Sequence, residues 1–392
     1  MTNLKNLKGL GSLALVALVG MVLTVLSSCE RRPLLFLHDE GEQPIILKIP
    51  VIQLDLDLFW DYYSDYDWRA EWTYGWDDND RKVFGDSIGY TIPNEFCLNR
   101  YFIGAMANQR HTERERFNFA GTRFIERYKF GYYDILTWSK IIPLEEAYSI
   151  ELIENLDSVV AMTRMTTHSA PYYPSSFPRA FNQPEQLFAG YMQNLYVSSD
   201  YNDYDYYDPA TNTYYKYVNM TLLPVTYIYL TQVRLHHNRG RIDGVSGEAN
   251  LSGMARSVTL NNGVAGHEVA TIHYNVLFKR NRPIQRTGEL VDVAGGRLLT
   301  FGIPRQNSAR LKGTDPLGYD GRHYMDVNFI FNNGMDSTFV FDVTDQVKRQ
   351  YKGGVITIDL DVDTIHIPTR KGGSGFNAVV EDWEEKEYEF EM

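Results

Sequence analysis

The chain has 392 residues, of which 44% are hydrophobic, 14% are aromatic and only two are Cys. Its formal net charge of −12 argues against nucleic acid as a partner, because a protein that neutralises phosphates needs a basic face. Two cysteines are too few for a disulfide framework or a cysteine-based metal cluster. At roughly 150 residues per domain, the length predicts about two domains.

The first 28 residues have the pattern of a cleaved signal. Lys5 and Lys8 form a basic start, and an apolar run over residues 10–26 leads through two serines to Cys29. Such a start, with small residues before a cut site, is typical of secretion. The cysteine at this point predicts a lipoprotein signal peptide over residues 1–28, with a lipid such as palmitate on Cys29. The alternative is a transmembrane anchor, but an apolar run of about 17 residues is short for a span of roughly 20.

A lipid on Cys29 leads to two further expectations. Two or more acyl chains hold a protein firmly at a membrane surface, so the mature chain is expected to be bound to a membrane through Cys29. Residues 29–44 are polar and rich in turn formers, and are expected to form a tether. Cys97 is then left without a partner in the chain and is expected to be a free thiol.

The first strand is predicted over residues 49–60, where apolar and polar residues alternate as in a half-buried strand. Residues 61–81, rich in Asp, Tyr and Trp, predict an exposed loop. Residues 131–139 predict a turn and a strand. Residues 200–217 repeat Tyr and Asp, which predicts a surface hairpin tip or loop, with a ligand-binding tyrosine patch as the alternative.

The rest of the chain predicts further short strands and no helix longer than about ten residues. Asn332, Asn333 and Gly334 predict a hairpin turn. Many strands at a spacing of roughly 8–12 residues predict an all-β fold of β-sandwich domains. We expect an N-terminal domain over residues 45–265 and a C-terminal domain over residues 266–392. The later predicted strands cover residues 269–278, 297–303, 323–331, 337–343, 355–367 and 376–390.

No catalytic pattern is complete. His267 and His273 are six residues apart, whereas a helical zinc motif needs two His four residues apart. Residues 77–80 begin like a calcium loop but lack its Gly turn and its bidentate Glu. A nucleophile elbow, a phosphate loop and a dinucleotide fingerprint are also missing from the sequence. The sequence therefore predicts a protein without catalytic residues, metal site or cofactor, and a β-sandwich hydrolase is disfavoured for want of paired acids.

Several segments resemble one family. Besides the signal, they are Gly131–Leu136, Leu251–Leu260, Phe341–Val347 and Phe376–Trp383. In this order they are similar to the fimbrillin-like proteins, which are lipoprotein pilus subunits and anchor subunits of Bacteroidales-type bacteria. The resemblance implies two tandem transthyretin-like β-sandwich domains, and a place on the cell outer membrane or in a fimbrium.

The resemblance also implies binding to other fimbrial subunits by strand exchange. In polymerising subunits, an Arg-specific protease removes the first strand with its lipid, and a strand from the next subunit fills the groove. Anchor subunits keep both their first strand and their lipid. Here Arg31 and Arg32 precede the first strand, and the next arginine after it is Arg69, which departs from the pattern of a polymerising subunit.

We therefore predict a fimbrial anchor or accessory pilus subunit that acts in surface attachment. The terminal strand, with Phe376, Val380 and Trp383, follows a flexible glycine-rich turn, so it is expected either to leave for a neighbouring subunit or to complete its own sandwich. The alternative function is a surface glycan-binding lipoprotein of a carbohydrate-uptake system, in which sugar rings stack on exposed aromatic side chains. The candidates for that role are Trp60, Trp68, Trp72, Trp76 and the tyrosines of residues 200–217.

Overall fold

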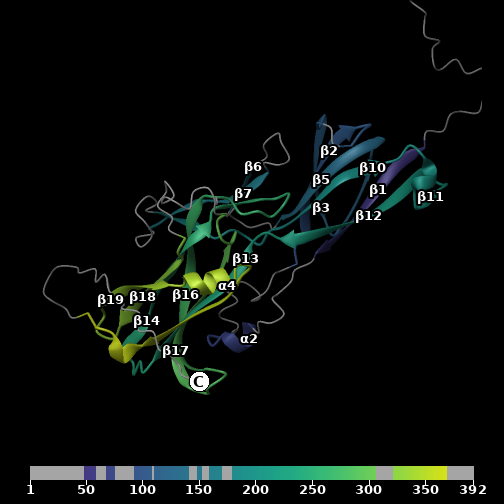
Figure 1. Cartoon of the computed structure of the whole chain (residues 1–392). Coiled ribbons are helices and arrows are strands. Elements are labelled where there is room, and N and C mark those ends of the chain that lie inside the picture. The colour runs from purple at the N-terminus through teal and green to yellow at the C-terminus, as the bar shows by residue number, and fades with distance from the viewer. Residues whose placement is uncertain are drawn as a thin grey trace, which may run out of the picture. The chain divides into compact units, whose positions relative to one another are not determined.

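The computed structural model describes residues 48–58, 68–75, 92–107, 110–140, 148–151, 159–169, 179–305 and 321–368. Almost all regular structure in these ranges is β, arranged in two large curled sheets and one small sheet (Figure 1). The all-β prediction is confirmed, and the two large sheets form two tandem β-sandwich domains. The described helices are α2 (Trp68–Glu71), α4 (Thr344–Arg349), and the 3-10 turns η2 (Tyr201–Asp203) and η3 (Val362–Thr364). Within the described ranges, every helix is too short to cross a membrane.

The first sheet is built from strands of the first 224 residues. They are β1 (Ile49–Leu58), β2 (Glu95–Gly104), β3 (Glu113–Ala120), β4 (Arg123–Arg127), β5 (Gly131–Lys140), β10 (Phe188–Val197), β11 (Tyr206–Asp208) and β12 (Thr213–Pro224). Their order is β3-β2-β5-β10-β12-β1-β4, and β11 pairs with β12. The long β12 joins the two halves of the sheet, because it pairs with β1 as far as Leu222 and with β10 at Leu223 and Pro224.

The first core lies between these two halves. In β1, Ile52 and Leu54 are fully buried, which confirms the alternation predicted for this strand. They pack with Leu98 of β2 and Ile135 of β5. Burying one such side chain stabilises the fold by roughly 1.5–3 kcal/mol. Since β1 pairs in parallel with β12 and antiparallel with β4, it occupies an inner position in the sheet. Figure 1 shows β1 beside β12.

The second sheet has the order β19-β18-β14-β16-β17-β13-β20, extended by β9 on β16 and β8 on β9. Its long strand β16 pairs with β14 as far as Asn275 and with β17 from Val276 onward. The sheet therefore curls as the first one does. The strands are β8 (Met165–Ser169), β9 (Arg179–Asn182), β13 (Tyr227–His236), β14 (Ile242–Ala255), β16 (Val269–Pro283), β17 (Leu290–Thr300), β18 (Tyr324–Phe331), β19 (Asp336–Asp342) and β20 (Gly354–Asp361). A small sheet contains β15 (Ser257–Thr259), β7 (Val160–Thr163) and β6 (Tyr148–Glu151).

The expected domain boundary between residues 265 and 266 falls inside the second sheet. β13 and β14 precede that point, yet they pair with β16, β17 and β20, which follow it. Gly244, Gly247 and Gly253 interrupt the alternation in this region, but β14 continues across them with shifts in its register. We propose instead that the chain passes from the first sandwich to the second between β12 and β13. β8 and β9, which come earlier in the sequence, also belong to the second sheet.

Two smaller expectations are confirmed. Residues 332–334 form the turn between β18 and β19, with Gly334 at a φ of 74°. Cys97 is a free, buried cysteine in β2. The described part of the predicted loop over residues 61–81 differs from the expectation, because residues 68–75 contain α2 and two buried aromatic side chains.

Candidate functional site

Residues 68–75, here called the docked segment, cover part of the outer face of the second sheet. Within it, Trp72 is 5% exposed and Tyr74 is 1% exposed. Trp72 is therefore excluded as an exposed platform for sugar rings in the alternative glycan-binding function. Its ring, 5.3 Å from that of Tyr74, is buried against side chains of the sheet and of the turn between β16 and β17. The partners in this cluster are Leu230, Ile284, Val291, Val293 and Val355.

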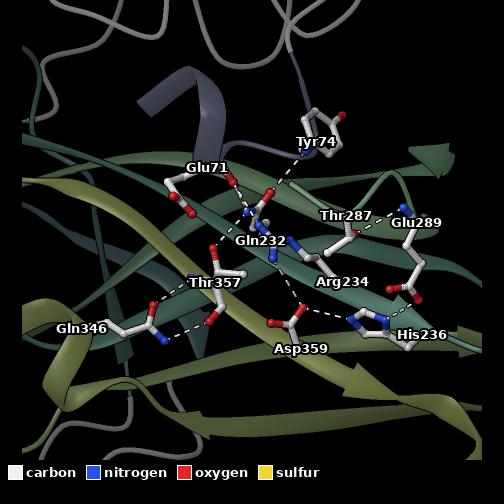
Figure 2. A network of polar contacts seen from close by, with 10 residues as sticks. All are labelled: Glu71, Tyr74, Gln232, Arg234, His236, Thr287, Glu289, Gln346, Thr357 and Asp359. Atoms are coloured by element: carbon white, nitrogen blue, oxygen red, sulfur yellow. Dashed lines mark hydrogen bonds and ion pairs between the residues drawn. The ribbon is translucent and has the colours of Figure 1, made fainter. Parts of the chain in front are cut away.

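Side chains of β13 bind the backbone of the docked segment (Figure 2). The Gln232 amide donates from Nε2 to the Glu71 carbonyl oxygen over 2.7 Å, and its Oε1 accepts from the Tyr74 N–H over 3.2 Å. Gln232 Nε2 also donates to Thr357 Oγ1 over 2.9 Å, and Arg234 donates to the Glu71 carbonyl over 3.2 Å. Gln232 is 1% exposed. Because a buried polar group without a partner costs about 1–3 kcal/mol, this amide strongly favours the docked state.

The Tyr74 ring fits a space that a glycine leaves open. A Cβ atom on Gly295 would lie 2.5 Å from the ring. On the ring, the Lys279 Nζ lies 4.1 Å from the centroid, and Arg286 forms an ion pair with Glu71 in the same segment. The docked segment is therefore held by ring packing, backbone hydrogen bonds and charge together.

We expect Gly295→Ala to displace the docked segment, because its new methyl group and the Tyr74 ring cannot share the same space. The free energy of unfolding should fall by about 1–3 kcal/mol, and the Tyr74 amide should exchange its hydrogen faster. Urea unfolding and hydrogen exchange measure these two effects. Gly244→Ala is the matched control, since a Cβ there meets nothing within 4 Å. Equal losses in both variants would contradict the steric explanation.

A histidine clamp lies at the end of β13, close to the docked segment (Figure 2). His236 Nδ1 lies 2.8 Å from Glu289 Oε1, and its Nε2 lies 3.0 Å from Asp359 Oδ1. Burial favours the neutral ring, but the hydrogen bonds to Asp359 and Glu289 outweigh it and raise the pKa of His236 above its usual value. The charged imidazolium thereby joins β13, β20 and the turn before β17.

The raised pKa sets the direction of a pH effect. Stabilisation by charged His236 is fully present below the unfolded pKa of about 6.5 and is lost as pH rises through the higher folded pKa. His236→Gln should therefore destabilise the protein by about 1 kcal/mol at pH 5.5, and the difference should shrink by pH 8.5. Urea unfolding at both pH values tests this. His267→Gln serves as the control, because His267 contacts the carbonyl oxygen of Arg305 rather than a carboxylate. A loss independent of pH would contradict the clamp.

A group of possible metal ligands lies beside the clamp. Atoms of His237, Asp361 and Asp363 all lie within 4.8 Å of one another. However, Asp363 forms ion pairs with Arg241 at 2.9 Å and Arg239 at 3.3 Å. The positive charge of two guanidinium groups beside one carboxylate opposes the binding of a metal ion there. We therefore assign these residues to a surface ion-pair network.

The tyrosine-rich segment forms the predicted surface hairpin. β11 and β12 pair so that Tyr207 faces Tyr214, with ring centroids 4.4 Å apart. Tyr201 of η2 adds a third ring, 4.5 Å from that of Tyr214. Tyr206 is 51% exposed and Tyr217 is 47% exposed. The hairpin therefore presents aromatic surface to solvent on a paired, hydrogen-bonded support.

The predicted site residues Cys29, Phe376, Val380 and Trp383 lie outside the described residues, as do Trp60, Trp76 and the tether. Trp68 begins α2. The sequence analysis missed Gln232 and Arg234. The available signal was an uncharged Gln in the middle of an apolar strand, which predicts a buried hydrogen-bonding partner on that face.

These observations define an all-β protein of two tandem β-sandwich domains. No family model and no curated protein matches the sequence. Solved structures similar to it include a proposed adhesin from Bacteroides ovatus, with a TM-score of 0.45 and 12% identity over 82% of this chain and 94% of that one. The fimbrial anchor protein Mfa2 from Porphyromonas gingivalis has a TM-score of 0.40 and 11% identity, over 79% of this chain and 90% of that one.

A proposed adhesin from Bacteroides thetaiotaomicron is also similar, with a TM-score of 0.43 and 10% identity, over 81% of this chain and 94% of that one. The similar structures thus include two proposed adhesins and a fimbrial anchor protein. At these scores the similarity assigns no function, so function has to be derived from the chain's own residues.

Proposed function

We propose that the protein is a non-catalytic lipoprotein of the cell outer membrane that acts as a fimbrial anchor or accessory pilus subunit in surface attachment. The observation that carries this proposal is the inner position of β1, which follows the predicted lipid site within about twenty residues. Force on a lipid at Cys29 would pass through the tether into β1. There it would be shared among backbone hydrogen bonds to β12 and to β4.

The docked segment supports retention of β1. The first arginine after this strand, Arg69, lies in α2. A protease needs its substrate extended, whereas Glu71, Trp72 and Tyr74 hold this stretch on the second sheet through hydrogen bonds and buried rings. The contact thus favours a subunit that keeps its first strand and lipid, as anchor subunits do, over one that loses them.

The second sandwich supports a donating role for the terminal strand. Its described strands already bury a core that includes Met325, Phe329 and Leu298, each under 2% exposed. That core is formed by side chains within residues 179–368, which precede the terminal segment. We therefore propose that the segment with Phe376, Val380 and Trp383 binds a partner subunit by strand exchange. Main-chain hydrogen bonds would then supply the affinity, and alternating side chains would set the register.

The exposed tyrosine hairpin favours a second candidate function. Tyr206 and Tyr217 offer aromatic faces on which sugar rings can stack, which suits a surface glycan-binding lipoprotein. Retarded migration in a polysaccharide gel that is lost in Tyr206→Ala with Tyr217→Ala would favour this function over attachment through fimbriae.

Cys29→Ser tests the lipid anchor. The sulfur of Cys29 is the predicted acylation site, so the variant should lose fatty-acid label completely and remain uncut or leave the membrane. Metabolic labelling with a fatty acid, followed by membrane fractionation, measures both effects. Cys97→Ser is the matched control and should keep its label, because Cys97 is buried in β2. Undiminished label in Cys29→Ser would refute the lipoprotein assignment.

Deletion of residues 376–392 tests strand exchange. If the terminal strand binds a partner, the shortened protein should melt within a few degrees of the full chain and reach the membrane, but should no longer co-isolate with fimbrial subunits. If the strand instead completes its own sandwich, loss of Trp383 alone would cost roughly 3 kcal/mol or more, out of about 5–15 kcal/mol of total stability. Circular dichroism melting and co-isolation distinguish the two cases, and an unfolded shortened protein would exclude the exchange role.

A further inference from the structure

β3 is the end strand of the first sheet. It pairs with β2 over its whole length, from Glu113 opposite Phe102 to Ala120 opposite Glu95. Among the described residues, β2 is its only strand neighbour. In an end strand, every second residue turns its backbone N–H and C=O groups away from the sheet. β3 therefore offers hydrogen-bonding groups to one additional strand.

The two faces of β3 carry opposite charges. Successive side chains of a strand point to opposite faces, so Glu113 and Glu115 lie on one face and Arg114 and Arg116 on the other. These side chains are held in place by the sheet. Glu115 pairs with Arg100 over 2.5 Å, while Arg116 donates to the sulfur of Cys97 over 3.1 Å.

This alternation disfavours pairing between two copies of β3. A two-fold axis that joins two identical end strands as antiparallel neighbours is perpendicular to the sheet and keeps each face on its own side. Residues of the same face then meet, so the registers that overlap residues 113–116 with themselves place Glu opposite Glu or Arg opposite Arg. Like charges directly opposite one another destabilise a pair of strands. A strand with the reverse pattern of charge therefore fits the charged part of β3 better than a second β3 does.

The reverse pattern occurs at residues 386–392 of the same sequence. We propose that β3 of one copy binds residues 386–392 of a neighbouring copy as a parallel strand. Acids then face both arginines, a lysine faces Glu113, and apolar residues continue the face of Phe117 and Phe119. The opposed pairs are Glu113 and Lys386, Arg114 and Glu387, Glu115 and Tyr388, Arg116 and Glu389, Phe117 and Phe390, Asn118 and Glu391, and Phe119 and Met392.

The alternatives fit less well. The antiparallel register that also places Glu387 opposite Arg114 brings Glu384 and Asp382 opposite Phe117 and Phe119. β19 and β20, which end the second sheet, contain no basic residue to face the acids. β4, at the other end of the first sheet, has five residues and so offers a shorter edge than the eight residues of β3.

The geometry of this contact leads to head-to-tail assembly. About 17 residues separate Pro368, the last described residue, from residue 386, and extended chain of this length spans up to roughly 60 Å. Each copy then offers one donor and one acceptor, so copies can join head to tail in an open chain. This inference rests on the proposed role in fimbrial assembly, and adds the receiving edge and the identity of the partner as a second copy.

Engineered cysteines test the contact in the full mature chain that carries Cys29→Ser. Arg114→Cys with Glu387→Cys should give a ladder of disulfide-linked dimers and larger species on a non-reducing gel. The matched control is Arg114→Cys with Lys386→Cys, in which the second cysteine lies on the other face and should give no ladder. The ladder should also be absent from each single variant. A disulfide within one chain, or none at all, would overturn the proposal.

A charge swap provides the second test. Arg114→Glu with Arg116→Glu should weaken self-association at least tenfold in analytical ultracentrifugation, and Glu387→Arg with Glu389→Arg should do the same. Combining all four changes should restore association, which would not occur if the first pair merely unfolded β3. Failure of rescue would overturn the proposed pairing. Acylation of Cys29 and co-isolation with other fimbrial subunits report on the proposed function separately, so either idea can fail alone.

Discussion

The inner position of β1 is the constraint on which the first sandwich depends. Its apolar face supplies Ile52, Leu54 and Leu56 to the core, and its two edges satisfy backbone groups of β12 and β4. Removing it would expose one side of both neighbours and open the core between the two halves of the sheet. The lipid proposed for Cys29 would therefore be attached shortly before a strand that is paired on both edges. A pull on it would be shared among the backbone hydrogen bonds of β1 to β12 and to β4.

The docked segment links that strand to the second sandwich. The connection depends on a neutral amide, since Gln232 binds the carbonyl of Glu71 and the N–H of Tyr74 at once. A charged side chain in this buried position would carry a large desolvation cost, whereas an amide pairs with both a donor and an acceptor at a smaller one. Arg234 and the His236 clamp lie toward the exposed end of the same face, where water lowers the cost of charge. Along β13, the side chains that face the docked segment therefore change from a neutral amide at Gln232 to charged groups at Arg234 and His236.

The sequence predicted the features that depend on local patterns. Alternation in residues 49–58 gives a half-buried strand whatever its partners are, and Asn-Asn-Gly gives a turn because these residues tolerate positive φ. The docked segment was not predictable in this way. Trp72 and Tyr74 sit among acidic residues typical of loops, and their partners in β13 lie more than 150 residues later. The pairing of β14 with β16, on opposite sides of the expected boundary, likewise depends on tertiary contacts that local patterns do not reveal.

The parallel pairing of β1 with β12 also has a consequence for how the chain folds. Ile49 pairs with Thr213, so a partner of the first strand is synthesised more than 160 residues after it. Contacts of such long sequence separation form slowly, because a large loop has to close before they stabilise anything. Until that loop closes, β1 is an unpaired apolar strand. Asp55 and Asp57, on its outward side, reduce the risk of aggregation in that interval, since charges within an apolar strand disfavour pairing with the wrong chain.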